Sequence, residues 1–138
     1  MNKLNRERLI NAKLNYEKRK YPNVPYLVDK VKWRETSANG LTNIIVHFLR
    51  WSGHQAERVN TTGIYDVRTK KFRRTTATRG SADIHAIINA KPVKIEIKIG
   101  KDRQSDYQKE YERSVIEAGG HYWIIKDFDM FIALYDTL

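Results

Sequence analysis

The sequence predicts an α/β fold in which a central mixed β-sheet is flanked by helices. Apolar residues recur at helical spacing over 41–51, and two later segments, 82–88 and 93–99, alternate between apolar and polar residues. A second helical pattern, 104–118, separates these strands from the apolar strand 122–125. Elements in this order favour one mixed sheet with helices packed on it. A chain of 138 residues has the size of one ordinary domain.

The N-terminal part has a different character from the rest of the chain. Residues 3–20 read as a basic helix with few apolar positions, and the stretch around Pro22 ends it because proline cannot continue a helix. Over 26–37 the pattern leaves open a short strand or an extended connection. We therefore expect 1–36 to form a basic helix with an extended arm that dimerises or grips a partner, and 37–138 to form the main domain.

The remaining elements follow from short patterns. The amphipathic helix 41–51 is stopped by Ser52-Gly53, with Gly53 as a favourable C-terminal cap. Three short segments are expected to form strands of an antiparallel meander: 54–60, 63–67 and 71–76. A final helix is expected over 127–135, with Asp127 as its N-cap.

The composition restricts the function classes. The chain has 26 Lys and Arg residues against 16 Asp and Glu, a formal net charge of +10, and a basic surface of this kind is typical of a nucleic-acid partner. It contains no cysteine, which excludes disulfides and cysteine-based zinc sites. No apolar run approaches the roughly 20 residues that span a bilayer, and the first residues lack the apolar core of a signal peptide. We expect no membrane association and a location in the cytoplasm or inside a host cell.

The two alternating strands predict a cluster of charged side chains. Strand periodicity places Glu96 and Lys98 on one face. A two-residue turn at Asn89-Ala90 sets Asp83 opposite Glu96, with Cβ atoms about 4.5–5.5 Å apart. Two such carboxylates repel each other unless a cation lies between them, and Mg²⁺ is commonly held in this way. On pattern alone, the solvated face of a hairpin accounts for these residues equally well.

The same residues carry a family resemblance. Gly80-Ser81-Ala82-Asp83 followed by Ile95-Glu96-Ile97-Lys98 resembles the PD-(D/E)xK nuclease superfamily. The later run 102–109, with Gly119-Gly120 and Tyr122 beyond it, resembles the VRR-NUC branch, which is similar to Holliday-junction resolvases. The resemblance spans roughly 41–135 and is specific over 80–122.

The resemblance implies a restriction-endonuclease-like core and Mg²⁺-dependent hydrolysis of DNA phosphodiesters, with Mn²⁺ as an expected substitute. It implies a metal site from Asp83, Glu96 and the main-chain carbonyl of Ile97. Lys98 then lies beside the attacking water, and Gln108 reaches the site from its helix. A homodimer is also expected, because symmetric cutting of two strands suits a twofold assembly.

The chain departs from the family pattern at two positions. Ala82 stands where the family usually has proline before the aspartate. The helix before the sheet usually offers a glutamate to the metal, whereas 41–45 contains none. Asn43 is the possible auxiliary ligand there, and its amide oxygen is a weaker, neutral donor.

Basic residues around the hairpin predict the contacts with DNA. No acid interrupts 68–81, and Lys and Arg pair with phosphate oxygens. The residues expected to bind nucleic acid are Arg68, Lys70, Lys71, Arg73, Arg74, Arg79, Lys101 and Arg103. His85 shares a face with Asp83, but we expect it to have a structural role because the carboxylates already supply the hard oxygen ligands that Mg²⁺ favours.

Two other functions stay open at this point. The missing helix glutamate favours a non-catalytic DNA-binding module with a degenerate nuclease site. RNA-directed cleavage is the other alternative, since nothing in the sequence reads the 2′-hydroxyl. The sequence also leaves open whether a nuclease of this kind prefers junctions, flaps or linear duplex.

Overall fold

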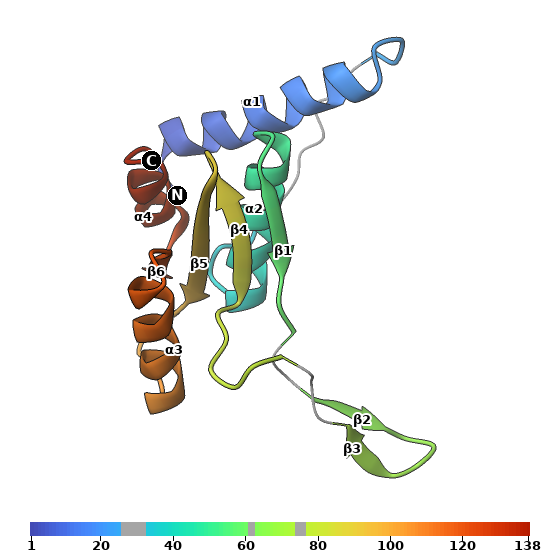
Figure 1. Cartoon of the computed structure of the whole chain (residues 1–138). Coiled ribbons are helices and arrows are strands. Elements are labelled where there is room, and N and C mark those ends of the chain that lie inside the picture. The colour runs from blue at the N-terminus through green and yellow to red at the C-terminus, as the bar shows by residue number, and fades with distance from the viewer. Residues whose placement is uncertain (26–32, 61–62, 74–76) are drawn as a thin grey trace.

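The computed structural model describes residues 1–25, 33–60, 63–73 and 77–138. A four-stranded sheet in the order β1-β4-β5-β6 lies at its centre (Figure 1). Its strands are β1 (Gln55–Arg58), β4 (Ile84–Ile88), β5 (Lys91–Ile97) and β6 (His121–Ile125). β4 pairs antiparallel with both β1 and β5, whereas β6 runs parallel to β5. The fold is therefore α/β with a mixed sheet flanked by helices, as the sequence predicts.

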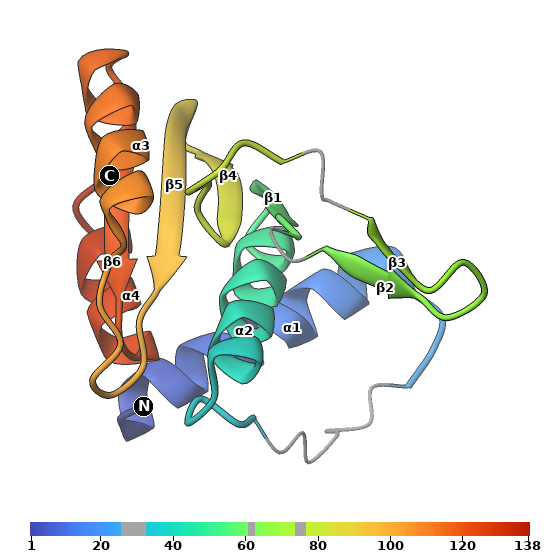
Figure 2. The ribbon, with the colours of Figure 1, turned by 90° about the horizontal axis from the view of Figure 1, so that it is seen from below.

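Helices cover both faces of this sheet (Figure 2). Helices α2 (Ala38–Trp51) and α4 (Phe128–Tyr135) lie on one face, and α3 (Asp106–Glu117) lies on the other. The crossover from β5 to the parallel strand β6 runs through α3. Helix α1 (Lys3–Lys20) crosses one end of the sheet and contacts α2 and α4. The two faces of the sheet therefore have different surroundings.

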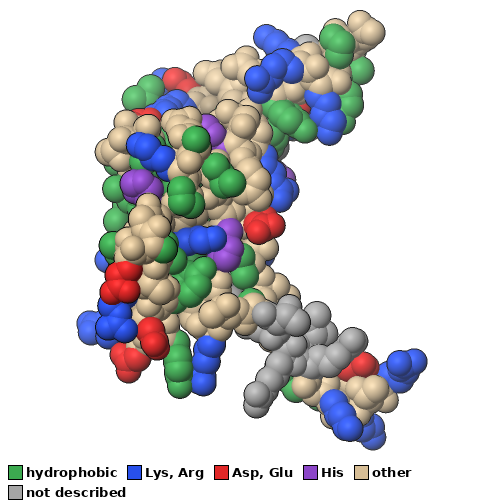
Figure 3. Space-filling view, viewed as in Figure 1, with side chains coloured by type: hydrophobic (Ala, Val, Ile, Leu, Met, Phe, Trp, Pro, Cys, Tyr) green, Lys and Arg blue, Asp and Glu red, His purple; other side chains and the backbone are tan. Residues whose placement is uncertain are grey.

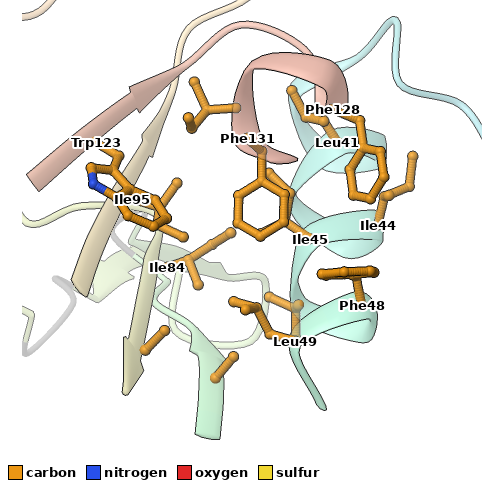
Figure 4. Close-up of a cluster of buried hydrophobic side chains, with 14 of the residues drawn as sticks. Leu41, Ile44, Ile45, Phe48, Leu49, Ile84, Ile95, Trp123, Phe128 and Phe131 are labelled. Atoms are coloured by element: carbon orange, nitrogen blue, oxygen red, sulfur yellow. The ribbon is translucent and has the colours of Figure 1, made fainter. Parts of the chain in front are cut away.

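The core lies between the sheet and the α2–α4 layer (Figure 4). Helix α2 begins where the Ser37 side chain accepts a hydrogen bond from the backbone N–H of Gly40. Its apolar stripe is buried, which confirms the predicted helix over 41–51, although the helix begins earlier, at Ala38. Phe131 of α4 is fully buried and packs against the rings of Phe48 in α2 and Trp123 in β6. The buried side chains of α2 are Leu41, Thr42, Ile44, Ile45, Val46, Phe48 and Leu49.

The predicted N-terminal helix over 3–20 is confirmed, and it packs against the rest of the chain. Leu9 is fully buried in the core. Arg8 forms a two-pronged hydrogen bond with Asp136, both contacts being 2.7 Å. Of the uncertain segment 26–37, residues 26–32 lie outside the described part, and 33–37 contain no strand.

The predicted meander is wrong. β1 pairs with β4, while β2 (Ile64–Asp66) and β3 (Lys71–Arg73) form a separate two-stranded hairpin. Ala56 and Ala86 are cross-strand partners and both are buried, which explains why β1 joins the main sheet. The hairpin residue Tyr65 is instead exposed. Residues 74–76 of the third predicted strand lie outside the described part.

The C-terminal elements match their predictions apart from small differences at the boundaries. Helix α3 begins with a capping box between Ser105 and Gln108. Asp127 caps α4 by accepting a hydrogen bond of 2.8 Å from the backbone N–H of Met130. Within the described residues, no helix combines the length and the apolar character needed to cross a membrane.

Candidate active site

The predicted register between β4 and β5 is confirmed. Ile88 is opposite Lys91, and the pairing continues to Ile84 opposite Ile95. The turn residues Asn89 and Ala90 have φ values of 49° and 64°, as a tight two-residue hairpin turn requires. One step beyond the ladder, the same register places Asp83 beside β5.

Asp83 is held against β5 by its own carboxylate. Its Oδ2 accepts a hydrogen bond of 2.9 Å from the backbone N–H of Ile97. Its main-chain carbonyl accepts a hydrogen bond of 2.8 Å from the N–H of Val59, beyond the end of β1. Both contacts fix Asp83 at the end of the sheet where β5 terminates. Ile97 therefore contacts Asp83 through its N–H, whereas the resemblance implies a role for its carbonyl.

Glu96 and Lys98 form a buried ion pair on the face of the sheet toward α3. Glu96 is 2% exposed and Lys98 is 7% exposed. Lys98 Nζ lies 3.1 Å from Glu96 Oε1. Each charge offsets part of the desolvation cost of the other. Sequence periodicity places both residues on one face, but it does not reveal their burial.

Gln108 of α3 joins both members of this pair. Its Oε1 accepts hydrogen bonds from Lys98 Nζ, at 3.1 Å, and from the backbone N–H of Ser105, at 2.9 Å. Its Nε2 donates to Glu96 Oε1. Because the backbone N–H of Ser105 can only donate, the amide oxygen must face it, which leaves the amide nitrogen for Glu96. The capping box thus also orients a side chain of the site.

Asp102 is a further member of the cluster that the sequence analysis did not single out. Its Oδ2 lies 3.4 Å from Lys98 Nζ. Asp102 follows β5 in an irregular segment, where no periodicity applies, so the sequence contains no signal for this contact. Lys98 accordingly has three oxygen partners, from Glu96, Asp102 and Gln108.

The electrostatics of Glu96 are unusual. Burial raises its pKa to about 7, and the neighbouring charge of Asp83 acts in the same direction. Oε2 of Glu96 is buried and has no hydrogen-bond partner among the residues that the structure describes. A buried carboxylate oxygen without a partner is unfavourable, and a cation is one group that would satisfy it. Glu96 thus has one oxygen bound by Lys98 and Gln108 and another available.

The carboxylates of the cluster are donors of the type that a hard divalent cation prefers. Asp83 and Glu96 supply carboxylate oxygens, and Mg²⁺ is often bound through one or two carboxylates with water and phosphate at its other positions. Among the described residues, no group of three or more His, Cys, Asp or Glu side chains is arranged to hold a metal. Asn43 is exposed on α2. Asp83 and Glu96 are therefore the two carboxylates of the cluster that could hold a metal.

His85 is engaged in a structural network on the same face. Its Nε2 lies 3.1 Å from Ser81 Oγ and 3.2 Å from the Tyr111 hydroxyl. Burial lowers its pKa, and the charge of Lys94 on the next strand adds to this effect. The ring also stacks on Tyr111, with an interplanar angle of 9°. These contacts join β4 to α3, as expected of a structural histidine.

An open hollow lies beside the cluster, at the start of α3. Arg79 is stacked over the ring of Tyr107, with its guanidinium carbon 3.6 Å from the ring centroid. At Gly80 the backbone passes close to the backbone of Tyr107. A Cβ at this position would lie 2.3 Å from the carbonyl oxygen of Tyr107, so only glycine fits without a shift. The contribution of Tyr107 had no signal in the sequence, since nothing there pairs 79 with 107. The hollow is lined by Arg79, Gly80, Ser81, Ser105, Tyr107 and Gln108.

The residues expected to contact DNA fall into two groups. Arg79, Lys101 and Arg103 are exposed in the segments that flank the cluster. Arg68, Lys70 and Lys71 are exposed on the β2–β3 hairpin, seen at the lower right of Figure 3. The side chain of Arg73 and the whole of Arg74 lie outside the described residues.

Comparisons of this chain with protein-family models, with curated proteins and with solved structures found no match.

Proposed function

We propose that this protein is a metal-dependent nuclease that hydrolyses DNA phosphodiester bonds at the cluster of Asp83, Glu96, Lys98 and Gln108. One observation carries the proposal. Within the described part of the chain, the buried Oε2 of Glu96 has no hydrogen-bond partner, and its carboxylate lies near the charge of Asp83 and contacts the ammonium group of Lys98. Two acids can hold a metal that activates water, and a lysine beside them can neutralise charge on a phosphate, so this set supports phosphodiester hydrolysis.

The metal we propose is Mg²⁺, held by Asp83 and Glu96, with Mn²⁺ able to replace it. When bound, such an ion polarises the phosphate and lowers the pKa of a water molecule. The resemblance to PD-(D/E)xK nucleases leads to the same assignment. It also suggests that the core is restriction-endonuclease-like. The mixed sheet supports this suggestion, because Asp83 and Glu96 meet at one end of the antiparallel β4–β5 pair.

Side chains of the cluster would orient the reacting groups and neutralise charge on the phosphate. Lys98 presents an ammonium group that can donate to a phosphate oxygen where negative charge develops. Gln108 holds Lys98 and Glu96 in fixed positions through its amide group. Arg79, stacked over Tyr107 at the neighbouring hollow, offers a cation to the DNA backbone beside the cluster.

A non-catalytic DNA-binding module is the second candidate function. Helix α2 contains no acidic residue that could join Asp83 and Glu96. Lys98 is also satisfied by Glu96, Asp102 and Gln108 in a closed network. A protein that had lost turnover would keep such a network for stability and its basic surface for binding.

Cleavage assays with a lysine variant distinguish the two functions. Wild type and Lys98→Ala are incubated with labelled duplex, flap and four-way-junction DNA in Mg²⁺, Mn²⁺ or EDTA. Lys91→Ala is the matched control, because Lys91 is an exposed lysine at the opposite end of β5. We expect metal-dependent cutting that falls at least about 100-fold in Lys98→Ala and is unchanged in Lys91→Ala. Binding measured in EDTA should persist in all three proteins.

Two results would contradict the nuclease proposal. DNA binding without cutting of any substrate in either metal supports the non-catalytic module. Cutting that persists in EDTA, or in Lys98→Ala, assigns the chemistry to other residues.

A further inference from the structure

The β2–β3 hairpin exposes two aromatic rings on one face. Tyr65 and Phe72 are direct cross-strand partners, so their side chains stand on the same side of the ribbon. Their ring centroids are 6.4 Å apart, and the residues are 54% and 66% exposed. Val67, in the turn, is 79% exposed. A two-stranded hairpin is only marginally stable in water, and burial in a core does not explain these apolar side chains.

The same hairpin is strongly basic. Its sequence over 64–73 has four basic residues and one acid. The acid, Asp66, is used within the turn, where its Oδ1 accepts hydrogen bonds from the backbone N–H groups of Arg68, at 3.0 Å, and Thr69, at 3.3 Å. Lys70 adopts a φ of 52°, which closes the turn. Two exposed aromatic rings and several exposed cations thus share one short ribbon.

The hairpin projects from the end of the sheet that contains the candidate active site. It is inserted between β1 and β4, whose adjoining ends pair through Arg58 and Ile84. The hydrogen bond from Val59 to Asp83 lies directly beyond this pair. Figures 1 and 2 both show the hairpin extending away from the sheet on this side. A DNA strand bound along the hairpin would therefore lead toward Asp83.

We infer that this hairpin binds unpaired DNA bases, with Tyr65 and Phe72 as the stacking surface and Arg68, Lys70 and Lys71 as phosphate contacts. Stacking on aromatic side chains together with a cationic surface is the general chemistry of single-strand recognition. A second copy of the hairpin is a poor partner for this aromatic surface, because its basic residues would repel those of the first. The inference rests on DNA as the substrate and deepens the proposed function. It predicts a preference for forks or flaps, where duplex and unpaired strand meet.

Fluorescence of 2-aminopurine tests the inference without any cleavage. The base is placed in the unpaired arm of a forked duplex and, for comparison, in a fully paired duplex, and binding is measured in EDTA. The double variant Tyr65→Val with Phe72→Val removes both rings but keeps residues that favour strands. The double variant Tyr65→Phe with Phe72→Tyr keeps both rings and is the matched control. Cross-strand NMR contacts verify that the hairpin forms in each protein.

Wild type and the ring-exchanged control should change the 2-aminopurine signal on the fork and bind it equally well. The valine variant should lose this change and bind the fork roughly tenfold more weakly, with unchanged affinity for the paired duplex. Equal binding of the fork by wild type and the valine variant overturns the inference. The inference is also overturned if the wild-type protein binds neither DNA. It is overturned as well if the valine variant differs from wild type only in its oligomeric mass. Because no cutting is measured, a protein that stacks on bases but cleaves nothing supports the hairpin and contradicts only the nuclease.

Discussion

Lys98 Nζ lies 3.1 Å from Oε1 of Glu96, and both side chains are buried on the face of the sheet toward α3. In the metal-free protein this ammonium group lowers the pKa of Glu96 through its hydrogen bond and its charge. The compensation is incomplete, because burial and Asp83 still hold the pKa of Glu96 at about 7. The protonation of Glu96 and the occupation of the metal site are thus expected to be linked.

The stability of the metal-free protein should fall as the pH rises from about 4.5 to about 7. The pKa of Glu96 is raised from 4.5 to about 7 on folding, so in this window the folded protein holds a proton that the unfolded chain has released. The stabilisation from this proton is complete below pH 4.5 and is lost as the pH rises through about 7. Its size is on the order of 3 kcal/mol. Urea denaturation in EDTA at several pH values, compared with Glu96→Gln, measures it. A slope that is the same in both proteins would assign the effect to other groups.

A divalent cation should raise the melting temperature at pH 8. Ion binding to the folded state alone stabilises it by mass action, and saturation with Mg²⁺ or Mn²⁺ should add on the order of 5 °C. The rise should disappear in Asp83→Asn and in Glu96→Gln. Glu117→Gln, which alters an exposed carboxylate at the far end of α3, should keep it. Equal shifts in all four proteins would indicate nonspecific ion effects.

The sequence sufficed for the part of the site that local geometry determines. Strand alternation and a two-residue turn predict the register that brings Asp83 beside β5, and the ladder from Ile84 to Ile88 confirms it. The contacts of Asp102 and Tyr107 depend on how the crossover segment returns onto the sheet, and no local pattern encodes this. Tertiary packing also decides which charges are buried.

The error over the three short strands has a similar cause. β1 has one buried residue, Ala56, and β2 and β3 are three residues long, so their alternation carries little information about partners. β1 pairs with β4, which is separated from it in the sequence by the whole hairpin. Sequence proximity favours the meander, whereas the pairing of Ala56 with Ala86 against α2 decides the outcome.

Replacing Gln108 should reduce turnover more than substrate affinity. Gln108→Ala removes the amide that holds Lys98 and Glu96, and we expect kcat to fall by roughly 100-fold with little change in KM. The variant also loses the capping box of α3, worth about 1 kcal/mol. Ser105→Ala is the control, because it removes the capping hydroxyl but leaves the Gln108 side chain and the N–H of residue 105. Similar turnover in both variants would mean that Gln108 acts only through helix stability.

Replacing Arg79 should weaken DNA binding in a salt-dependent manner. Loss of one phosphate contact lowers the slope of log affinity against log salt by about 0.9 for duplex DNA. Arg79→Ala should show this decrease, whereas Arg79→Lys should keep the slope but bind less tightly, because lysine lacks the planar group that stacks on Tyr107. Titrations by anisotropy in EDTA at several salt concentrations measure both effects. Tyr107→Phe retains the ring and should match wild type. Unchanged slopes in Arg79→Ala would remove Arg79 from the DNA contacts.

The N-terminal helix should prove essential to the stability of the whole chain. Leu9 belongs to α1 and is fully buried in the core, so Leu9→Ala deletes packed methyl groups and should lower the free energy of unfolding by about 2–5 kcal/mol. Leu4, on the same helix, is 67% exposed, and Leu4→Ala should change stability by less than about 0.5 kcal/mol. Denaturant unfolding followed by tryptophan fluorescence compares the two, since Trp123 belongs to the core that α1 helps to cover. If the two variants are equally stable, α1 does not contribute to the core and acts as a separate arm. A large loss in Leu9→Ala alone means that any contact α1 makes with DNA is made from a fixed position on the domain.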